Sequence, residues 1–319
     1  MTGGKATAVV FANVKVGVRC LSVLLAGGME VKLVVTHEED PQEVVHFASV
    51  IEAARRYGLP LALPGNAGHP AFVDRIVGLA PDFIFSFYYR QMLPSSILAA
   101  ARRGALNMHG SLLPRYRGRA PINWVVIKGE TETGASLHYM TDKPDAGDIV
   151  DQQAVPILPD DTAYDVFNKV TVAAEIVMWR SLPGLVSGDI KATRQDPRAA
   201  SYFGRRRPED GEIDWSAHAK TVHDLVRGVA PPYPGAYTML GRSKLRILRT
   251  AREDGPAAPT GAPALFLSDG AWFAACGGGG VLRVSDMDLD GRSVSAHDLE
   301  KALGGARFPL QTPNRRPVG

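Results

Sequence analysis

Short apolar runs alternate with amphipathic segments along the first part of the chain. Five runs have the length and composition of buried strands, and they cover residues 8–12, 31–35, 61–63, 83–87 and 105–109. The stretches between them carry apolar residues at helical spacing, at residues 14–26, 47–57, 71–79 and 95–101. Strands that alternate with helices form a parallel sheet with right-handed crossovers. The pattern therefore predicts an α/β domain built on a doubly wound parallel sheet.

The pattern continues with two strands and a long helix before it changes. Residues 134–140 and 149–157 are predicted strands that return to cover the functional site expected at the carboxyl ends of the sheet. A helix from residue 162 to about residue 182 is predicted to end at Pro183-Gly184. Residues 187–215 are rich in Gly, Asp, Arg and Pro, which is typical of a segment that connects two domains.

Short strands dominate the remainder of the chain. A helix is predicted at residues 219–229 and another at residues 296–303. Between them lie short apolar runs separated by Gly- and Pro-rich turns, at residues 237–240, 244–248, 264–267, 272–275 and 281–287. Such strands predict a small barrel. We therefore expect two domains: a Rossmann-like domain over residues 1–200 and a smaller, C-terminal open β-barrel (OB-like) over residues 201–319.

The residues best suited to chemistry lie at the end of the predicted strand 105–109. Successive side chains of a strand point to opposite faces, so Asn107 and His109 share one side, ahead of a Gly110-Ser111 loop. In doubly wound sheets ligands bind outside the carboxyl ends of the strands. Asp145, from a later segment, is a carboxylate that would orient the imidazole and raise its pKa. Each residue alone is typical of a turn or a buried polar position, but together they supply an oxyanion donor, a proton acceptor and a tuning carboxylate for acyl-type transfer.

The sequence around these residues resembles the folate-dependent formyltransferases. The run from Asn107 to Pro114, with the later Asp145, is similar to the signature of this family, which transfers a formyl group from 10-formyltetrahydrofolate to an amine. Residues 85–90, 115–124 and 129–134 are similar to one subfamily, the formyltransferase half of the bifunctional polymyxin-resistance enzymes. That subfamily formylates UDP-4-amino-4-deoxy-L-arabinose during lipid A modification. The similarity runs from about Ala8 to Pro234-Gly235 and also implies an open-barrel second domain.

The resemblance implies roles for individual residues. It makes Asn107, His109 and Asp145 the catalytic residues, with a consumed folate co-substrate and neither a metal ion nor a covalent enzyme intermediate. It also implies folate contacts at Gln91, Met92, Leu93, Arg119, Thr141, Asp142, Lys143, Pro144 and Asp145. Arg115 and Arg117 precede Arg119 in the loop after the strand, where a guanidinium would match a phosphate or the glutamate carboxylate of a folate. For Arg205, Arg206 and Arg207 a binding role and a charged connecting segment both stay open.

Composition narrows the classes of partner. The chain has 36 basic and 33 acidic residues, a net charge of +3, so its overall field does not indicate a nucleic-acid partner. Cys20 and Cys276 lie far apart without metal-ligand spacing, and we expect free thiols in a reducing cytoplasm. Residues 1–12 lack the apolar core of a secretory signal, and no apolar run has the length of a membrane span. We expect a cytoplasmic enzyme with small-molecule substrates, and the oligomeric state stays open.

Other glycines and histidines do not indicate further sites. The segment after the first strand lacks the G-x-G-x-x-G motif, which argues against a dinucleotide site. The run Gly277–Gly280 lacks the context of a phosphate-binding loop and is predicted to be a hairpin turn. The remaining histidines have no mutual spacing for a metal and are expected to be solvated or buried structural residues: His37, His46, His69, His138, His218, His223 and His297.

Three alternative functions stay open. Methionyl-tRNA formyltransferases share the chemistry, but resemblance to them implies Ala in place of Arg119 and a basic early loop, whereas residues 36–43 are acidic here and would repel RNA phosphates. A formyltetrahydrofolate hydrolase would use the same three residues to release formate. A folate- or nucleotide-sensing module would not need them. The nucleotide and the sugar of the acceptor are not determined by the sequence.

Overall fold

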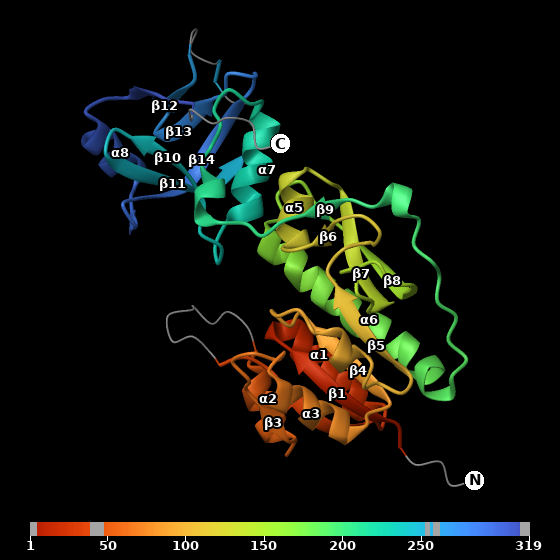
Figure 1. The fold of residues 1–319 in the computed structure, drawn as a ribbon. Coiled ribbons are helices and arrows are strands. Elements are labelled where there is room, and N and C mark those ends of the chain that lie inside the picture. Colours follow the sequence, from red (N-terminus) through yellow and green to blue (C-terminus); the bar gives the residue numbers. More distant parts are fainter. Residues whose placement is uncertain (1–4, 39–47, 253–255, 258–261, 313–319) are drawn as a thin grey trace. The chain divides into compact units, whose positions relative to one another are not determined.

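The structure is a computed structural model in which residues 5–38, 48–252, 256–257 and 262–312 are described (Figure 1). The chain divides into two compact units. Unit 1 comprises Met1–Pro121, Glu132–Pro156 and Phe167–Gly204, and unit 2 comprises Ile122–Thr131, Ile157–Val166 and Arg205–Gly319. The last division, at Gly204, lies close to the domain boundary expected after residue 200. Two short segments that precede this boundary nevertheless belong with unit 2.

Unit 1 is built on one twisted sheet in the order β3-β2-β1-β4-β5-β7-β8. The strands from β3 to β5 are parallel, as the alternation of strands and helices predicted. Their bounds are Thr7–Ala12 for β1, Glu30–Val35 for β2, Leu61–Ala62 for β3, Phe83–Phe87 for β4 and Gly104–His109 for β5. All six residues of β1 are buried, because the strand is central in a sheet whose two faces are covered. The fold of unit 1 is therefore Rossmann-like.

One expectation about this sheet was wrong. The strands β7 (Glu132–Tyr139) and β8 (Ile149–Pro156) do not cover the site but extend the sheet beyond β5 as an antiparallel hairpin. The reason is that the edge of β5 has unpaired backbone groups, and β7 satisfies them as an antiparallel neighbour after the connection that contains β6 and α5. This pairing sets residues of β7 directly beside Asn107 and His109.

The helices follow the predicted segments with local differences. Their bounds are Val14–Ala26 for α1, Val50–Arg56 for α2, Pro70–Leu79 for α3, Ser95–Leu98 for α4, Pro121–Ile127 for α5 and Ala163–Ser187 for α6. Helix α2 begins after Ser49, whose side chain accepts a hydrogen bond from the Glu52 N–H at 3.1 Å, and the predicted start at Phe47 lies outside the described residues. Helix α6 continues through Pro183 to Ser187, so the predicted end at Pro183-Gly184 is about one turn too early.

Unit 2 is an antiparallel half-barrel, in agreement with the predicted barrel. Its strand order is β10-β11-β14-β13-β12-β16, with β15 beside β14. The core gathers around the fully buried Trp215 and Trp272, whose indole N–H groups donate to the Thr238 hydroxyl and the Ala296 carbonyl. The bounds are Ala236–Leu240 for β10, Ser243–Ala251 for β11, Ala264–Ser268 for β12, Ala271–Ala275 for β13, Val281–Leu289 for β14, Arg292–Ser293 for β15, Arg307–Pro309 for β16, Ala219–Val229 for α7 and Ala296–Leu303 for α8.

The run Gly277–Gly280 forms the turn between β13 and β14, as predicted. A Cβ atom on Gly278 would lie 2.5 Å from the backbone nitrogen of His218, so the turn needs glycine where it approaches the start of α7.

The connecting segment contains structure that its composition did not predict. Strand β9 (Tyr202–Phe203) pairs in parallel with β6 (Arg117–Gly118), within unit 1. Two short 3-10 turns, Pro197–Ala199 and Pro208–Gly211, flank this pairing. The segment is therefore attached to the loop that follows β5.

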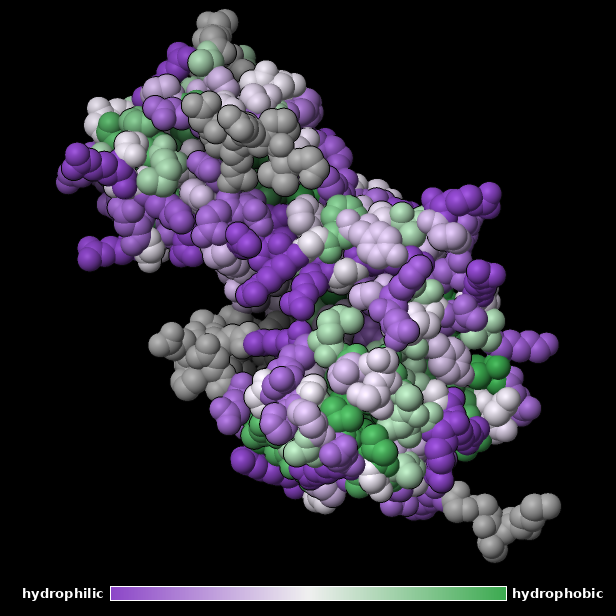
Figure 2. Space-filling model, in the orientation of Figure 1, coloured by the Kyte–Doolittle hydropathy of each residue, from purple (hydrophilic) through white to green (hydrophobic). Residues whose placement is uncertain are grey.

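Polar and apolar residues intermingle on the face of the molecule in Figure 2. Within the described part of the chain, no helix has both the length and the apolar character needed to span a membrane.

Candidate functional site

The candidate site lies at the carboxyl edge of the sheet in unit 1, where β5 ends. Asn107 is half-buried and His109 is 6% exposed, and both lie on the same side of β5 as predicted from strand geometry. Residues after neighbouring strands adopt left-handed backbone conformations there, with φ of +60° at Tyr88, +58° at Tyr116 and +54° at Asp145. Such conformations are uncommon for residues with side chains and tend to gather at functional sites.

The loop after β7 brings Asp145 to His109. The carboxylate Oδ1 of Asp145 lies 3.5 Å from Nδ1 of His109, and its Oδ2 accepts a hydrogen bond of 2.8 Å from the Gly118 N–H. Two residues later the chain turns so tightly that a Cβ atom on Gly147 would collide with the Tyr139 carbonyl. The glycine therefore permits the turn that delivers Asp145, and the structure brings the three predicted catalytic side chains together.

The imidazole of His109 has a partner at each nitrogen. Its Nε2 lies 2.8 Å from the Tyr116 carbonyl, which only accepts, so this nitrogen carries a proton and donates. Burial lowers the pKa of His109, and the nearby His138 and Arg117 lower it further, whereas Asp145 and the bond to Tyr116 raise it. The net direction is downward. The expectation that Asp145 raises this pKa was therefore right about the carboxylate's own effect and wrong about the net result, because desolvation of the imidazolium is larger.

The carboxyl of Asp145 stays ionised. Burial by itself would raise its pKa, but His109, His138 and the Gly118 N–H together hold the pKa far below its usual range. At neutral pH the site thus combines an ionised carboxylate with a neutral, buried imidazole. A neutral imidazole beside a carboxylate can take up a proton during a reaction and be stabilised while it holds it.

His138 belongs to the same cluster, although the sequence indicated only a structural histidine. It lies on β7 directly opposite Asn107 and is 1% exposed. Its Nδ1 donates to the Tyr139 carbonyl at 2.8 Å, and its Nε2 lies 3.2 Å from Nδ2 of Asn107 and 3.6 Å from Oδ1 of Asp145. The pairing therefore orients the Asn107 amide. The sequence showed that His138 lies in a predicted strand. It did not show that this strand pairs with β5, and that pairing brings His138 to Asn107.

Buried hydroxyl and amide groups fix the loop between Gly110 and Tyr116. The Ser136 hydroxyl donates to the Ser111 carbonyl at 2.6 Å and accepts from the Leu113 N–H at 3.1 Å. The Ser111 hydroxyl donates to the Arg115 carbonyl at 2.7 Å. The Tyr116 carbonyl that faces His109 is thus held by a connected set of hydrogen bonds.

The predicted folate-contacting residues lie in three loops of unit 1, which follow β4, follow β6 and connect β7 to β8. Gln91 uses its side-chain amide within the chain, since it accepts from the Ala67 N–H and donates to the Gly65 carbonyl, both at 2.9 Å. Met92 is 62% exposed, and Leu93 packs against the core around Val9 and Phe11. The others are exposed apart from Asp145, which is half-buried: Arg119, Thr141, Asp142, Lys143 and Pro144.

The three arginines of the loop after β5 differ. Arg115 and Arg119 are exposed, whereas Arg117 is 4% exposed and turned into unit 1. Arg205 and Arg207 are exposed, and Arg206 stacks over the Trp124 ring at 4.8 Å in unit 2. The exposed guanidinium groups of Arg115 and Arg119 are suited to an anionic ligand, while the buried guanidinium of Arg117 is part of the loop's own structure.

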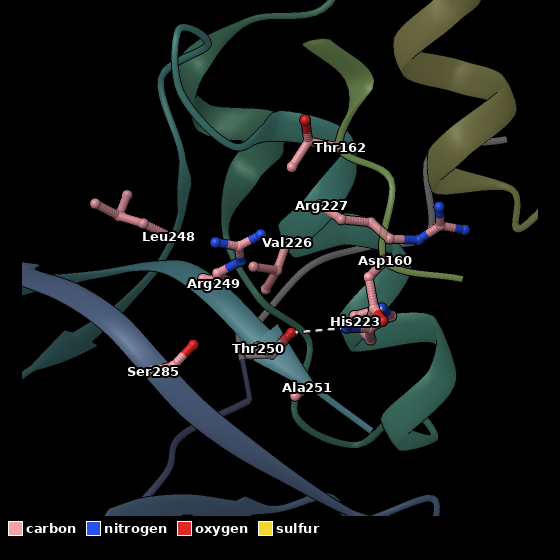
Figure 3. A pocket seen from close by; sticks show the side chains of 10 residues that line it. All are labelled: Asp160, Thr162, His223, Val226, Arg227, Leu248, Arg249, Thr250, Ala251 and Ser285. Carbon is pink, nitrogen blue, oxygen red and sulfur yellow. Dashed lines mark hydrogen bonds and ion pairs between the residues drawn. The ribbon is translucent and has the colours of Figure 1, made fainter. Parts of the chain in front are cut away.

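Unit 2 contains a separate cavity of about 200 Å³ (Figure 3). Among the residues that line it, His223 is 3% exposed and bonds to the Thr250 hydroxyl at 2.9 Å and to the Pro159 carbonyl at 3.1 Å. Figure 3 shows the side chain of Arg227 directed away from that of Arg249. Across the described residues, no group of three or more His, Cys, Asp or Glu side chains is placed to hold a metal ion.

Comparison with known proteins identifies the family. Residues 8–182 match the formyl transferase family, and residues 205–302 match the formyl transferase C-terminal domain. A sugar 3N-formyltransferase, WlaRD, solved with dTDP and 5-N-formyl-THF, aligns with a TM-score of 0.69 at 17% identity over 89% of this chain and 98% of its own. An N-formyltransferase from Helicobacter canadensis, solved with folinic acid and dTDP-3-aminofucose, aligns with a TM-score of 0.69 at 16% identity, over 88% and 99% of the two chains. Methionyl-tRNA formyltransferase from Clostridium thermocellum gives 0.56 at 15% identity, over 79% and 95%. The chain therefore belongs to the formyl transferase family.

Proposed function

We propose that this protein transfers the formyl group of 10-formyltetrahydrofolate to the amine of a nucleotide-linked aminosugar. The observation that carries the proposal is the cluster at the end of β5, where the Asn107 amide lies on the same side as the buried His109–Asp145 pair. Amide transfer requires stabilisation of an oxyanion and movement of one proton between two nitrogens. This cluster supplies both without a metal ion.

Each side chain has a defined task in this reaction. The sugar amine attacks the formyl carbon in its neutral form, and the Asn107 amide N–H that is not directed at His138 stabilises the charge on the formyl oxygen. His109 takes the proton that the attacking nitrogen loses and returns it to the nitrogen that leaves. When the substrate replaces the Tyr116 carbonyl as the partner of Nε2, the single proton of the neutral ring moves to Nδ1 and is donated to Asp145, which leaves Nε2 free to take the amine proton. Asp145 then stabilises the transient imidazolium. The products are a formamide and tetrahydrofolate, so atoms and charge balance.

The folate is assigned to the loops on either side of β5. Gln91, Met92 and Leu93 follow β4 at the carboxyl edge. Thr141–Asp145 follow the antiparallel β7, whose end pairs with the first half of β5, and this connection brings Asp145 to His109. The Gln91 amide keeps the loop at residues 65–67 in place, and the exposed backbone of residues 141–144 offers polar groups to a pterin. Arg119 is the nearby exposed cation for a carboxylate or phosphate.

The acceptor that we propose is UDP-4-amino-4-deoxy-L-arabinose, whose formylation belongs to lipid A modification and polymyxin resistance. The support is the resemblance of residues 85–90, 115–124 and 129–134 to enzymes with that substrate. The similarity in fold to two sugar N-formyltransferases supports the broader class of acceptor. Within the acidic stretch 36–43, residues 39–43 lie outside the described residues. A cytoplasmic location stays a prediction.

The test is a formyl-transfer assay with purified protein, 10-formyltetrahydrofolate and a panel of acceptors. The panel contains UDP-4-amino-4-deoxy-L-arabinose, dTDP- and GDP-linked aminosugars, initiator methionyl-tRNA and a reaction without acceptor. We expect a formylated UDP-aminosugar, identified by mass spectrometry. Formylated methionyl-tRNA as the main product would contradict the proposal, and so would release of formate at the same rate with and without an acceptor, which would indicate a hydrolase.

A further inference from the structure

The segment between the two matched domains completes the candidate site. The family matches end at residue 182 and resume at residue 205, so neither assigns a role to the residues between them. Within that interval, Thr193 exchanges two backbone hydrogen bonds with Ile149, and Phe203 pairs with Gly118 through β9. The segment therefore lies across the loops that carry both Asp145 and the Tyr116 carbonyl.

Gln195 is the central polar residue of this segment. It is 6% exposed, and its amide Nε2 donates to the Asp145 carbonyl at 3.0 Å and to the Gly147 carbonyl at 2.6 Å. Its Oε1 accepts from Nη2 and Nε of Arg117, at 2.6 and 3.2 Å. One side chain thus joins the loop of Asp145 to the loop of Arg117, and every bond it makes is buried or nearly so.

The hydrogen bonds from Arg117 to Gln195 matter because Arg117 is a buried cation. Its guanidinium is buried, and its partners are the neutral oxygens of Gln195 and of the Tyr202 hydroxyl. Within the described ranges of the chain, no carboxylate lies within ion-pair distance of it. A buried cation that loses its acceptor carries a large desolvation penalty and moves towards the nearest anion. Asp145 lies on the other loop that Gln195 holds, and its Oδ2 accepts from the N–H of Gly118, the residue that follows Arg117.

We propose that Gln195 is a positioning residue for the formyl transfer reaction. It satisfies Arg117 with a neutral oxygen and anchors the Asp145 turn with its amide protons, so that the Asp145 carboxylate faces His109 and not Arg117. The proposal rests on the proposed function for its kinetic readout. The arrangement also means that the active site depends on a segment outside both matched domains.

The direct test is Gln195→Met, which preserves the side chain's length and removes all of its hydrogen bonds. We expect kcat to fall by about 10- to 100-fold, as for loss of a residue that orients a reacting group, with KM for both substrates changed less than threefold. Histidine NMR should show a lower pKa for His109, because Arg117 draws Asp145 away. The matched control is Gln153→Met on β8, a half-buried glutamine that accepts from Arg180 at 2.8 Å; this variant should stay within about twofold of wild type.

A double variant separates positioning from general damage. Arg117→Met combined with Gln195→Met removes the orphaned cation, so kcat and the pKa of His109 should both rise relative to the single variant. This variant contains no unpaired buried charge, and it keeps the test available should Gln195→Met fold poorly. Unchanged kcat and an unchanged His109 pKa in Gln195→Met would overturn the proposal, as would a double variant with a lower kcat than the single one. The NMR titration needs no substrate, so an inactive wild-type protein would contradict the proposed function and leave this test intact.

Discussion

Each of the two units buries a histidine. The groups around the first are those of a residue that transfers protons, and the groups around the second are those of a residue that stabilises the fold. His109 in unit 1 and His223 in unit 2 are 6% and 3% exposed, and burial lowers the pKa of both. The partners of His223 within hydrogen-bond distance are a hydroxyl and a carbonyl, from Thr250 and Pro159. His109 instead faces a carboxylate that is itself held by a backbone N–H, at a sheet edge with left-handed residues.

This difference shows that burial alone does not indicate a catalytic histidine. The bonds of His223 join α7 to β11 and to the segment before α6, and the nearest carboxylate, Asp160, is 75% exposed and 3.6 Å away. Such a ring stabilises the packing of unit 2. The ring of His109 is paired with an ionised carboxylate that the Gly118 N–H holds in place, so protonation during a reaction would be stabilised there. We therefore expect substitutions at the first site to change rate and those at the second to change stability.

The largest effect is expected at the amide beside His109. Asn107→Ala should lower kcat by about 10²- to 10³-fold, because it removes an oxyanion donor, while the dissociation constant for the folate changes little. Steady-state kinetics and fluorescence titration with the folate measure the two constants. The control is Asn123→Ala in unit 2, where a buried amide donates to the Gly228 carbonyl at 2.9 Å and should matter for stability only. An unchanged kcat in Asn107→Ala would remove this residue from the mechanism.

The second effect concerns the histidine of unit 2. His223→Leu should reduce the free energy of unfolding by about 1–3 kcal/mol, since the Thr250 hydroxyl and the Pro159 carbonyl lose their partner. Urea unfolding followed by circular dichroism gives the stability, and kcat should stay within about twofold of wild type. If kcat collapsed while stability was retained, His223 would belong to the functional site and the contrast between the units would fail.

The smallest effect is a pH dependence shared by both histidines. Their folded pKa values are lowered, so the unfolded chain binds protons that the native state does not, and stability is lost as the pH falls from about 7 to about 5. In Asp82 burial raises the pKa, but hydrogen bonds from Thr7 and the charge of Arg102 lower it more. The contribution of Asp82 to the free energy of unfolding is fully present above the pKa of the unfolded state and is lost as the pH falls through the folded pKa. Urea midpoints measured from pH 7 to pH 5 should fall, and the fall should be shallower in His223→Leu; flat midpoints would contradict the pKa directions.

Local patterns predicted the sheet and the cluster of candidate residues more fully than they predicted the residues that hold this cluster in place. The alternation of strands and helices predicted β1 to β5, and strand geometry put Asn107 and His109 on one side. His138 was missed because its role depends on the pairing of β7 with β5, which is antiparallel and not visible in a local period. Gln195 was missed because a Gly- and Arg-rich segment predicts a linker, while its function depends on contacts with residues more than 45 positions away.

The direction in which the pKa of His109 is shifted could not be predicted from the sequence either. Proximity to Asp145 predicts a raised pKa, and only the burial of the ring in the folded chain reverses the direction. The same structural information distinguishes Arg117, which is buried, from Arg115 and Arg119, which are exposed, although the three alternate along one short loop.

The measurement that tests the central claim most directly is the pH dependence of kcat for wild type and Asp145→Asn. The claim is that Asp145 acts on His109 by raising the pKa of an imidazole that works in its neutral form. In Asp145→Asn we predict a lower plateau and an acid limb displaced to lower pH, because the imidazole loses the charge that favoured its protonated form. Circular dichroism confirms that the variant is folded. Acid limbs that coincide for the two proteins would show that Asp145 does not tune His109 and would contradict the account.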